Sequence, residues 1–174
     1  MARVSTLDKE DVSEELQTMF QRIEDHGGKI LNLFKTVAHC PAIGPQFLRL
    51  GNAILLKGSL PPHLRELAIL RVGRLAQADY EVTQHIPIGR RAGLTDEQIE
   101  ALAHWRETSC FGAQARAVLQ YTDEVTQQTR ASEETFQAVK KILSEEQIVE
   151  LTLVVGYYGM VCRVLETLQV DLDK

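Results

Sequence analysis

Apolar residues recur at spacings of three and four along most of the chain, and the alternation of apolar and polar residues that indicates a half-buried strand is nearly absent. Leu16, Phe20 and Ile23 show the helical spacing clearly, and Gly27 ends that segment. The pattern predicts an all-α protein of eight or nine helices with short polar connections. We expect these helices approximately over residues 11–25, 30–38, 41–56, 62–75, 78–92, from 95 onward, 113–128, 132–143 and 144–170.

Several predicted helices have recognisable first residues. Thr95 with Gln98, and Ser144 with Gln147, have the spacing of a capping box, in which each side chain bonds the backbone N–H near the other. Pro62 suits the first turn of its helix because the N–H that proline lacks would have no hydrogen-bond partner within the helix there. No low-complexity linker interrupts the chain, so we expect a single compact multi-helix domain over residues 1–174.

Composition and charge narrow the class of protein. The chain has 174 residues, 44% hydrophobic and 25% charged, which is typical of soluble globular proteins. Its net charge is −5, and no run of basic residues is longer than a pair such as Arg90-Arg91, so we expect no nucleic-acid partner. The apolar runs are short and the first residues are charged, so we expect no membrane segment, no secretory signal and a cytoplasmic location.

Cysteine and histidine usage indicates neither a disulfide framework nor a metal site. Cys40, Cys110 and Cys162 are odd in number and far apart, without a C-x-x-C pair. The five histidines are scattered and form no H-E-x-x-H motif. We therefore expect no metal site.

The candidate chemistry lies in two neighbouring predicted helices. Glu81 and His85 are four residues apart and share one helix face, and Glu66 lies beside an apolar face of the preceding helix. If Glu66 and His85 face each other, they form a proton relay near neutral pH. Arg65, Arg71 and His85 are candidate partners of Glu66. The alternatives are a solvated Glu–His pair and an ordinary salt bridge.

Aromatic residues offer further candidates. Tyr80 precedes Glu81, and Tyr157 with Tyr158 stands in a G-Y-Y-G run; their hydroxyls can line a pocket or be satisfied within a core or a subunit interface. Trp105 and Phe111 lie in a less regular segment, where they form a lid or simply pack.

The run from Arg65 to Leu94, R-E-L-A-I-L-R-V-G-R-L-A-Q-A-D-Y-E-V-T-Q-H-I-P-I-G-R-R-A-G-L, resembles the carboxymuconolactone decarboxylase family of the all-helical alkylhydroperoxidase D-like superfamily. The segments L-F-K-T-V-A-H-C-P-A at 33–42 and V-G-Y-Y-G-M-V-C-R-V-L at 155–165 agree with it. The resemblance covers residues 30–170 as a family core and leaves 1–29 as an N-terminal helical extension.

The peroxidase branch of that superfamily uses a glutamate, a C-x-x-C pair and a histidine four residues after the second cysteine. Counting back from His85 puts Glu81 and Ala78 at the cysteine positions, while Glu66 matches the upstream glutamate. Thiol peroxidases need a thiolate and a resolving thiol, which neither residue supplies. An alkylhydroperoxidase-like antioxidant role is therefore disfavoured.

The resemblance instead implies the decarboxylase-like branch, whose members often read Y-E-x-x-x-H, as Tyr80–His85 does here. It implies a cofactor-independent lyase of aromatic-compound catabolism that decarboxylates or isomerises a small carboxylated lactone or enol-type carbonyl compound. His85 would be the acid/base, Glu66 its orienting partner and Glu81 a second polar group in the pocket. It also implies a homo-oligomer, a trimer or hexamer. A non-catalytic oligomer that binds a small molecule is the remaining alternative. The substrate-binding residues expected on this basis are Tyr80, Tyr157, Tyr158 and Arg65.

Overall fold

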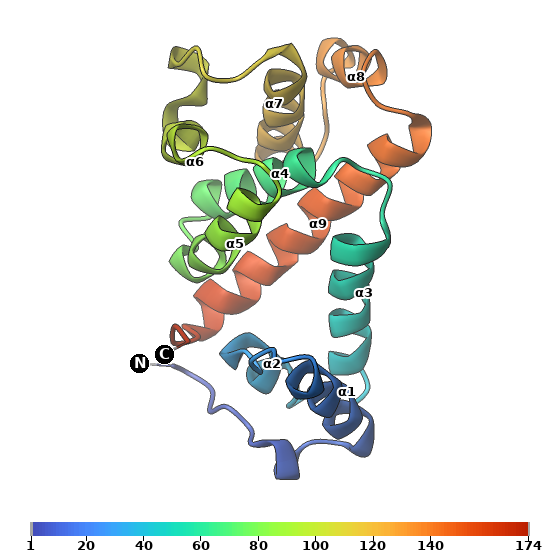
Figure 1. Cartoon of the computed structure of the whole chain (residues 1–174), viewed down its shortest axis with the longest axis vertical. Helices are drawn as coiled ribbons and strands as arrows, with labels where there is room; N and C mark the ends of the chain where they lie inside the picture. Colours follow the sequence, from blue (N-terminus) through green and yellow to red (C-terminus); the bar gives the residue numbers. More distant parts are fainter. Residues whose placement is uncertain (1, 174) are drawn as a thin grey trace. The chain divides into compact units, whose positions relative to one another are not determined.

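The structure is a computed structural model that describes residues 2–173. Over these residues the chain forms nine α-helices and two short 3₁₀ helices and no strand, which confirms the predicted all-α class (Figure 1). The elements are η1 Lys9–Asp11, α1 Glu14–Asp25, α2 Asn32–Val37, α3 Gly44–Lys57, α4 Pro62–Leu75, α5 Asp79–Arg91, α6 Asp96–Ala101, η2 Leu102–Glu107, α7 Ala113–Gln128, α8 Glu133–Lys140 and α9 Glu145–Leu168.

The predicted helix starts are borne out where caps fix them. Thr95 Oγ1 accepts a hydrogen bond from the Gln98 N–H at 3.2 Å, and Gln98 Oε1 accepts one from the Thr95 N–H at 3.1 Å. Ser144 and Gln147 form the same reciprocal pair at 3.2 and 3.1 Å. These bonds satisfy N–H groups that the first helical turn leaves without partners.

The chain divides into two compact units. The first comprises the described residues up to Lys57 together with those from Val164, and the second is Gly58–Arg163. In the first unit α3 packs against both α1 and α2, and the fully buried Leu16 and Phe20 lie on α1. The expectation of a single domain over 1–174, with an extension at 1–29, stays a prediction.

Helix α4 is the centre of the second unit. Its ten consecutive residues from Leu64 to Gly73 are all buried, and it contacts α5, α7 and η2 (Figure 1). A helix enclosed on every side has no solvated face for its charged side chains. Three of those buried residues, Arg65, Glu66 and Arg71, are charged, so each needs a partner inside the protein.

Arg71 finds its partner on α7 and not at Glu66. Its Nε and Nη2 donate to the Asp123 carboxylate at 2.5 and 3.2 Å, and its Nη1 donates to the Leu102 carbonyl at 2.7 Å. Trp105 Nε1 also donates to Asp123, at 3.1 Å. The expectation that Arg71 is a candidate partner of Glu66 is therefore wrong. A bidentate arginine–carboxylate pair instead joins α4 to α7.

Trp105 and Phe111 serve packing. Both are buried in a hydrophobic cluster with Leu67 and Leu70 of α4, at 4% and 3% exposure. Residues held in this way do not cover or uncover a site, so of the two alternatives left by the sequence, lid or packing, the structure favours packing.

The segment before α4 is fixed by the Glu150 side chain of α9. Its Oε1 accepts a hydrogen bond from the Ser59 N–H at 2.8 Å, and its Oε2 accepts one from the Leu60 N–H at 2.6 Å. A Cβ on Gly58 would lie 2.9 Å from Glu150 Oε2, so this close approach depends on a glycine. These contacts hold the start of α4, and with it the position of Glu66.

Helix α9 has 24 residues and is long and apolar enough, by length and composition alone, to cross a membrane. Half of its most apolar stretch is buried inside the protein, where Leu151, Val154 and Tyr158 contribute to the core. The core helix of a soluble protein passes the same test.

Glycines allow α4 and α5 to pack closely. A Cβ on Gly73 of α4 would lie 2.9 Å from Val82 Cγ2, and one on Gly89 of α5 would lie 3.2 Å from Leu70 Cδ1. Neither glycine has a left-handed backbone, so their role is the absence of a side chain where two helices meet.

We expect Gly73→Val to lower the free energy of unfolding by about 2 kcal/mol, because the added methyl groups must displace the buried Val82. The matched control is Gly156→Val, since nothing lies within 4 Å of a Cβ on this helical glycine. The control should stay within about 0.5 kcal/mol of the wild type. Chemical denaturation of the three proteins measures both, and equal stabilities of the two variants would contradict the packing role.

Candidate active site

The centre of the candidate site is a hydrogen bond between α4 and α5. His85 Nδ1 of α5 lies 2.8 Å from Glu66 Oε2 of α4. Glu66 is fully buried and His85 is 6% exposed, so water does not screen this pair. The structure thus brings together the two residues that the sequence singled out, and neither is a solvated surface group.

Arg65 is the hydrogen-bond donor to the second oxygen of Glu66. Its Nε donates to Glu66 Oε1 at 3.2 Å, and the arginine side chain is itself buried. Each oxygen of Glu66 therefore has a hydrogen-bond partner inside the protein, as a fully buried carboxylate requires.

Glu81 lies on the other side of the imidazole. Its Oε1 is 3.0 Å from His85 Nε2, which is ion-pair distance, and the side chain is buried. The same oxygen has no aligned hydrogen-bond donor among the described residues. Leaving a buried acceptor unmet costs about 1–3 kcal/mol. Its place in the first turn of α5 favours the negative charge through the helix dipole, but supplies no donor.

The four groups form a neutral cluster with a protonated histidine at its centre. Two carboxylates, Glu66 and Glu81, face two cations, Arg65 and His85. Burial alone lowers the pKa of His85, but the contacts with Glu66 and then Glu81 outweigh it and raise that pKa to about 9. His85 is therefore an imidazolium at neutral pH, which donates a hydrogen bond from Nδ1 to Glu66 and lies at ion-pair distance from Glu81.

Two tyrosines of α9 lie beside the histidine. The Tyr158 ring meets the His85 ring edge to face, with centroids 5.0 Å apart, and Tyr157 meets Tyr158 in the same way at 5.2 Å. Burial, followed by the charges of Glu81 and Glu66, raises the pKa of Tyr158 far above its ordinary value, so its phenol stays neutral. Tyr80 is also buried, on α5 beside Glu81, and its expected contact with a substrate stays a prediction.

The sequence analysis missed two glycines that shape the site. A Cβ on Gly73 would lie 3.7 Å from both Cβ and Cγ of Glu81, and one on Gly89 would lie 3.8 Å from Glu66 Cβ. The aliphatic part of each glutamate therefore packs against bare backbone of the opposite helix. A glycine inside an apolar helical run, seven residues after Glu66, was the available sign in the sequence.

The two positions that carry cysteines in the peroxidase branch hold no thiol here. Ala78 is fully buried immediately before α5, and Glu81 contacts His85 as described. Of the actual cysteines, Cys40 is exposed, Cys110 is half-buried near Thr108, and Cys162 is buried on α9.

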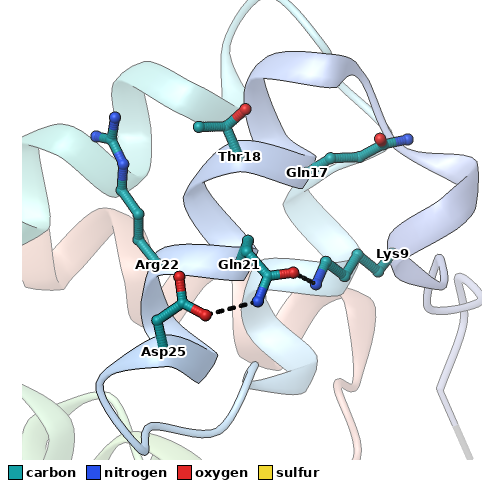
Figure 2. A pocket seen from close by; sticks show the side chains of 6 residues that line it. All are labelled: Lys9, Gln17, Thr18, Gln21, Arg22 and Asp25. Atoms are coloured by element: carbon teal, nitrogen blue, oxygen red, sulfur yellow. Dashed lines mark hydrogen bonds between the residues drawn. The ribbon is translucent and has the colours of Figure 1, made fainter.

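A separate hollow of about 470 Å³ lies in the first unit and contains none of these residues (Figure 2). Two of its charged groups, Lys9 and Asp25, are engaged with neighbours: Lys9 donates to Gln21 Oε1 and to Glu24 Oε2, both at 2.5 Å, and Gln21 donates to Asp25 Oδ1 at 2.7 Å. Within residues 2–173, no group of three or more His, Cys, Asp or Glu side chains is arranged so that it could hold a metal ion. The hollow therefore offers no chemistry comparable to the buried cluster.

Comparison with known proteins agrees with this geometry. Residues 41–124 match the model of the Carboxymuconolactone decarboxylase family, a range that includes Glu66, Glu81 and His85. The chain is also 27% identical over 94 residues to the uncharacterised protein YdfG of Bacillus subtilis (strain 168). That match covers 53% of this chain and 64% of the relative, so the chain spans slightly less than two thirds of that protein.

Solved structures share the fold at low identity. The alkylhydroperoxidase AhpD core of a peroxidase-related protein from Ralstonia eutropha JMP134 superposes with a TM-score of 0.88 at 20% identity, over 99% of this chain and 93% of that one. The debrominase Bmp8, crystallised as a variant with 2,3,4-tribromopyrrole, gives 0.81 at 19% identity, over 98% and 91%. The chain thus combines an alkylhydroperoxidase D-like fold with a segment, residues 41–124, that matches the carboxymuconolactone decarboxylase family and contains the Glu–His pair.

Proposed function

We propose that the protein is a cofactor-independent acid/base enzyme of the carboxymuconolactone decarboxylase type. It acts on a small carboxylated lactone or enol-type carbonyl compound by decarboxylation or isomerisation. The observation that carries this proposal is the buried imidazolium of His85 between the carboxylates of Glu66 and Glu81.

The cluster has what such chemistry needs. Loss of CO₂ or of a proton next to a carbonyl leaves an electron pair that spreads into an enolate, which must be stabilised and then protonated at carbon. A buried positive charge stabilises a developing enolate much better than water does, because the low local dielectric strengthens the attraction. His85 provides this charge, and Glu66 orients it through Nδ1.

Thiol chemistry has less support. The fold is shared with peroxidase-related proteins and with a debrominase, but the residues at the two thiol positions are Ala78 and Glu81. A carboxylate cannot be oxidised and reduced as a thiolate can, so the group beside His85 is suited to proton transfer.

The homo-oligomer implied by the resemblance stays part of the proposal. Val149, Leu153 and Met160 of α9 are exposed apolar residues at helical spacing, 59%, 52% and 42% accessible, and their burial by a second copy would be favourable.

Glu66→Gln and His85→Gln should each reduce turnover about a hundredfold or more, since each removes a member of the acid/base pair. Carbon dioxide release from carboxymuconolactone and isomerisation of α-angelica lactone, a neutral enol lactone, are the assays. The controls are Glu97→Gln and His63→Gln, which change exposed residues outside the cluster. Unchanged turnover in both cluster variants would contradict catalysis by the pair, and unchanged ligand affinity without any turnover would favour a binding protein.

The pKa of His85, raised to about 9, predicts the pH dependence. Activity that needs the imidazolium should hold at neutral pH and fall as pH rises through about 9. In Glu66→Gln the fall should move to lower pH by roughly 1–3 pH units, because an opposite charge is lost. The raised pKa also makes the stability of the fold depend on pH. The contribution of the ion pairs to the free energy of unfolding is complete below pH 6.5, the unfolded-state pKa of His85, and is lost as the pH rises to about 9. Profiles of kcat against pH for the wild type and for Glu66→Gln test the predicted loss of activity at high pH. The same profile in both proteins would contradict the prediction.

A protein without cysteines should keep its activity. We expect the triple variant Cys40→Ser, Cys110→Ser and Cys162→Ala to retain turnover within about twofold, the alanine being chosen because Cys162 is buried. The wild type should show no thiol-dependent peroxide reduction in a coupled assay. Loss of activity in the triple variant, with thermal stability unchanged, would instead indicate a thiol mechanism.

A further inference from the structure

Both nitrogens of His85 have a carboxylate oxygen in front of them, hydrogen-bonded at Nδ1 and at ion-pair distance without an aligned hydrogen bond at Nε2. Nδ1 lies 2.8 Å from Glu66 Oε2, Nε2 lies 3.0 Å from Glu81 Oε1, and the Tyr158 ring stands 5.0 Å from the imidazole. An imidazole has only these two positions for a proton. A substrate therefore cannot exchange a proton with His85 directly unless it displaces one of the carboxylates.

Glu81 is the member of the cluster with an unsatisfied hydrogen-bond acceptor, its Oε1. Glu66 has a donor at each oxygen, whereas Glu81 Oε1 is buried without an aligned donor. Among the described residues the other buried side-chain atom in this condition is the Thr126 hydroxyl, which is uncharged. An unfilled acceptor position on a buried carboxylate is suited to a proton or a donor from a ligand.

The position of Glu81 is fixed as well. Its Cβ and Cγ pack where a side chain on Gly73 would be 3.7 Å away, and its carboxylate faces the imidazolium. A base held in place beside a positive charge can take a proton from carbon while that charge stabilises the resulting anion.

We propose that Glu81 is the catalytic residue that moves the proton, that His85 acts through its charge, and that the reaction is isomerisation of a small neutral enol lactone. This inference rests on the proposed acid/base function and selects isomerisation over decarboxylation. The substrate carries no carboxylate because a second anion beside the Glu81 carboxylate is repelled.

The step balances without any co-reactant. The Glu81 carboxylate forms an O–H bond with the proton on the ring carbon next to the lactone carbonyl, and the C–H electron pair moves into the ring as a dienolate. The dienolate is held beside the His85 imidazolium. Glu81 then returns the proton to the ring carbon at the far end of the conjugated system, which gives the conjugated lactone and restores the carboxylate.

The test uses α-angelica lactone and its carboxymethyl analogue, which differ by a carboxylate. Isomerisation is followed by absorbance of the conjugated product and, in D₂O, by proton NMR of deuterium entering the ring carbons. We expect the wild type to turn over the neutral lactone with a kcat/KM about tenfold or more above that of the carboxylate analogue.

Glu81→Gln should lower kcat for the neutral lactone about a hundredfold or more and leave KM nearly unchanged. Glu81→Ala should be inactive and recover part of its activity in added formate, which supplies the missing carboxylate. A structural role would give no such recovery. The matched control Glu97→Gln should behave as the wild type, and circular dichroism checks that each variant is folded.

The outcomes separate the two proposals. If neither lactone nor carboxymuconolactone is turned over by the wild type, the acid/base function itself is wrong. If the wild type is active and Glu81→Gln keeps its kcat, or formate does not restore Glu81→Ala, Glu81 is not the proton carrier. If the carboxylate analogue is the better substrate, the inferred neutral substrate is wrong.

Discussion

The full enclosure of α4 is the constraint on which the second unit depends. Ten successive residues of this helix are buried, and three of them are charged, so the neighbouring helices must supply the opposite charges. Asp123 of α7 meets Arg71, and His85 of α5 meets Glu66. Breaking one member of a buried pair leaves an uncompensated charge and costs about 3–5 kcal/mol. These pairs therefore determine which helices can lie against α4 and in what register.

The same constraint places reactive groups where they are needed. Because α4 and α5 meet at glycines, the stems of Glu66 and Glu81 lie against opposite backbones and their carboxylates converge on one imidazole. An imidazolium between two carboxylates is stable in a buried place only when the charges balance, and Arg65 completes the balance. Packing and chemistry thus depend on the same few residues, and a change in the helix spacing would alter the protonation state of His85.

Local signals predicted the helices well, and long-range partners were predicted poorly. The caps at Thr95 and Ser144 and the prolines before α4 act on adjacent residues, so the starts of α4, α6 and α9 were predictable. Glu66 and His85 were paired through the spacing of a family motif, since helical periodicity alone left a solvated pair equally open. Arg71 was misassigned because its partner Asp123 lies 52 residues away. The roles of Gly73 and Gly89 become apparent only once it is known which helices pack together.

Glu81 shows why the position of a residue matters more than the chemistry usual for its fold. A thiol beside the histidine could lose its proton and then be oxidised and reduced, whereas a carboxylate at the same place can exchange protons only. The carboxylate of Glu81 balances the charge of His85, but its Oε1 lacks an aligned hydrogen-bond donor, which is a cost to the folded protein. This cost is removed when a bound ligand donates a hydrogen bond or a proton to that oxygen. The imidazolium then has two effects at once: it lies at ion-pair distance from the base, and it stabilises the anion that the base creates.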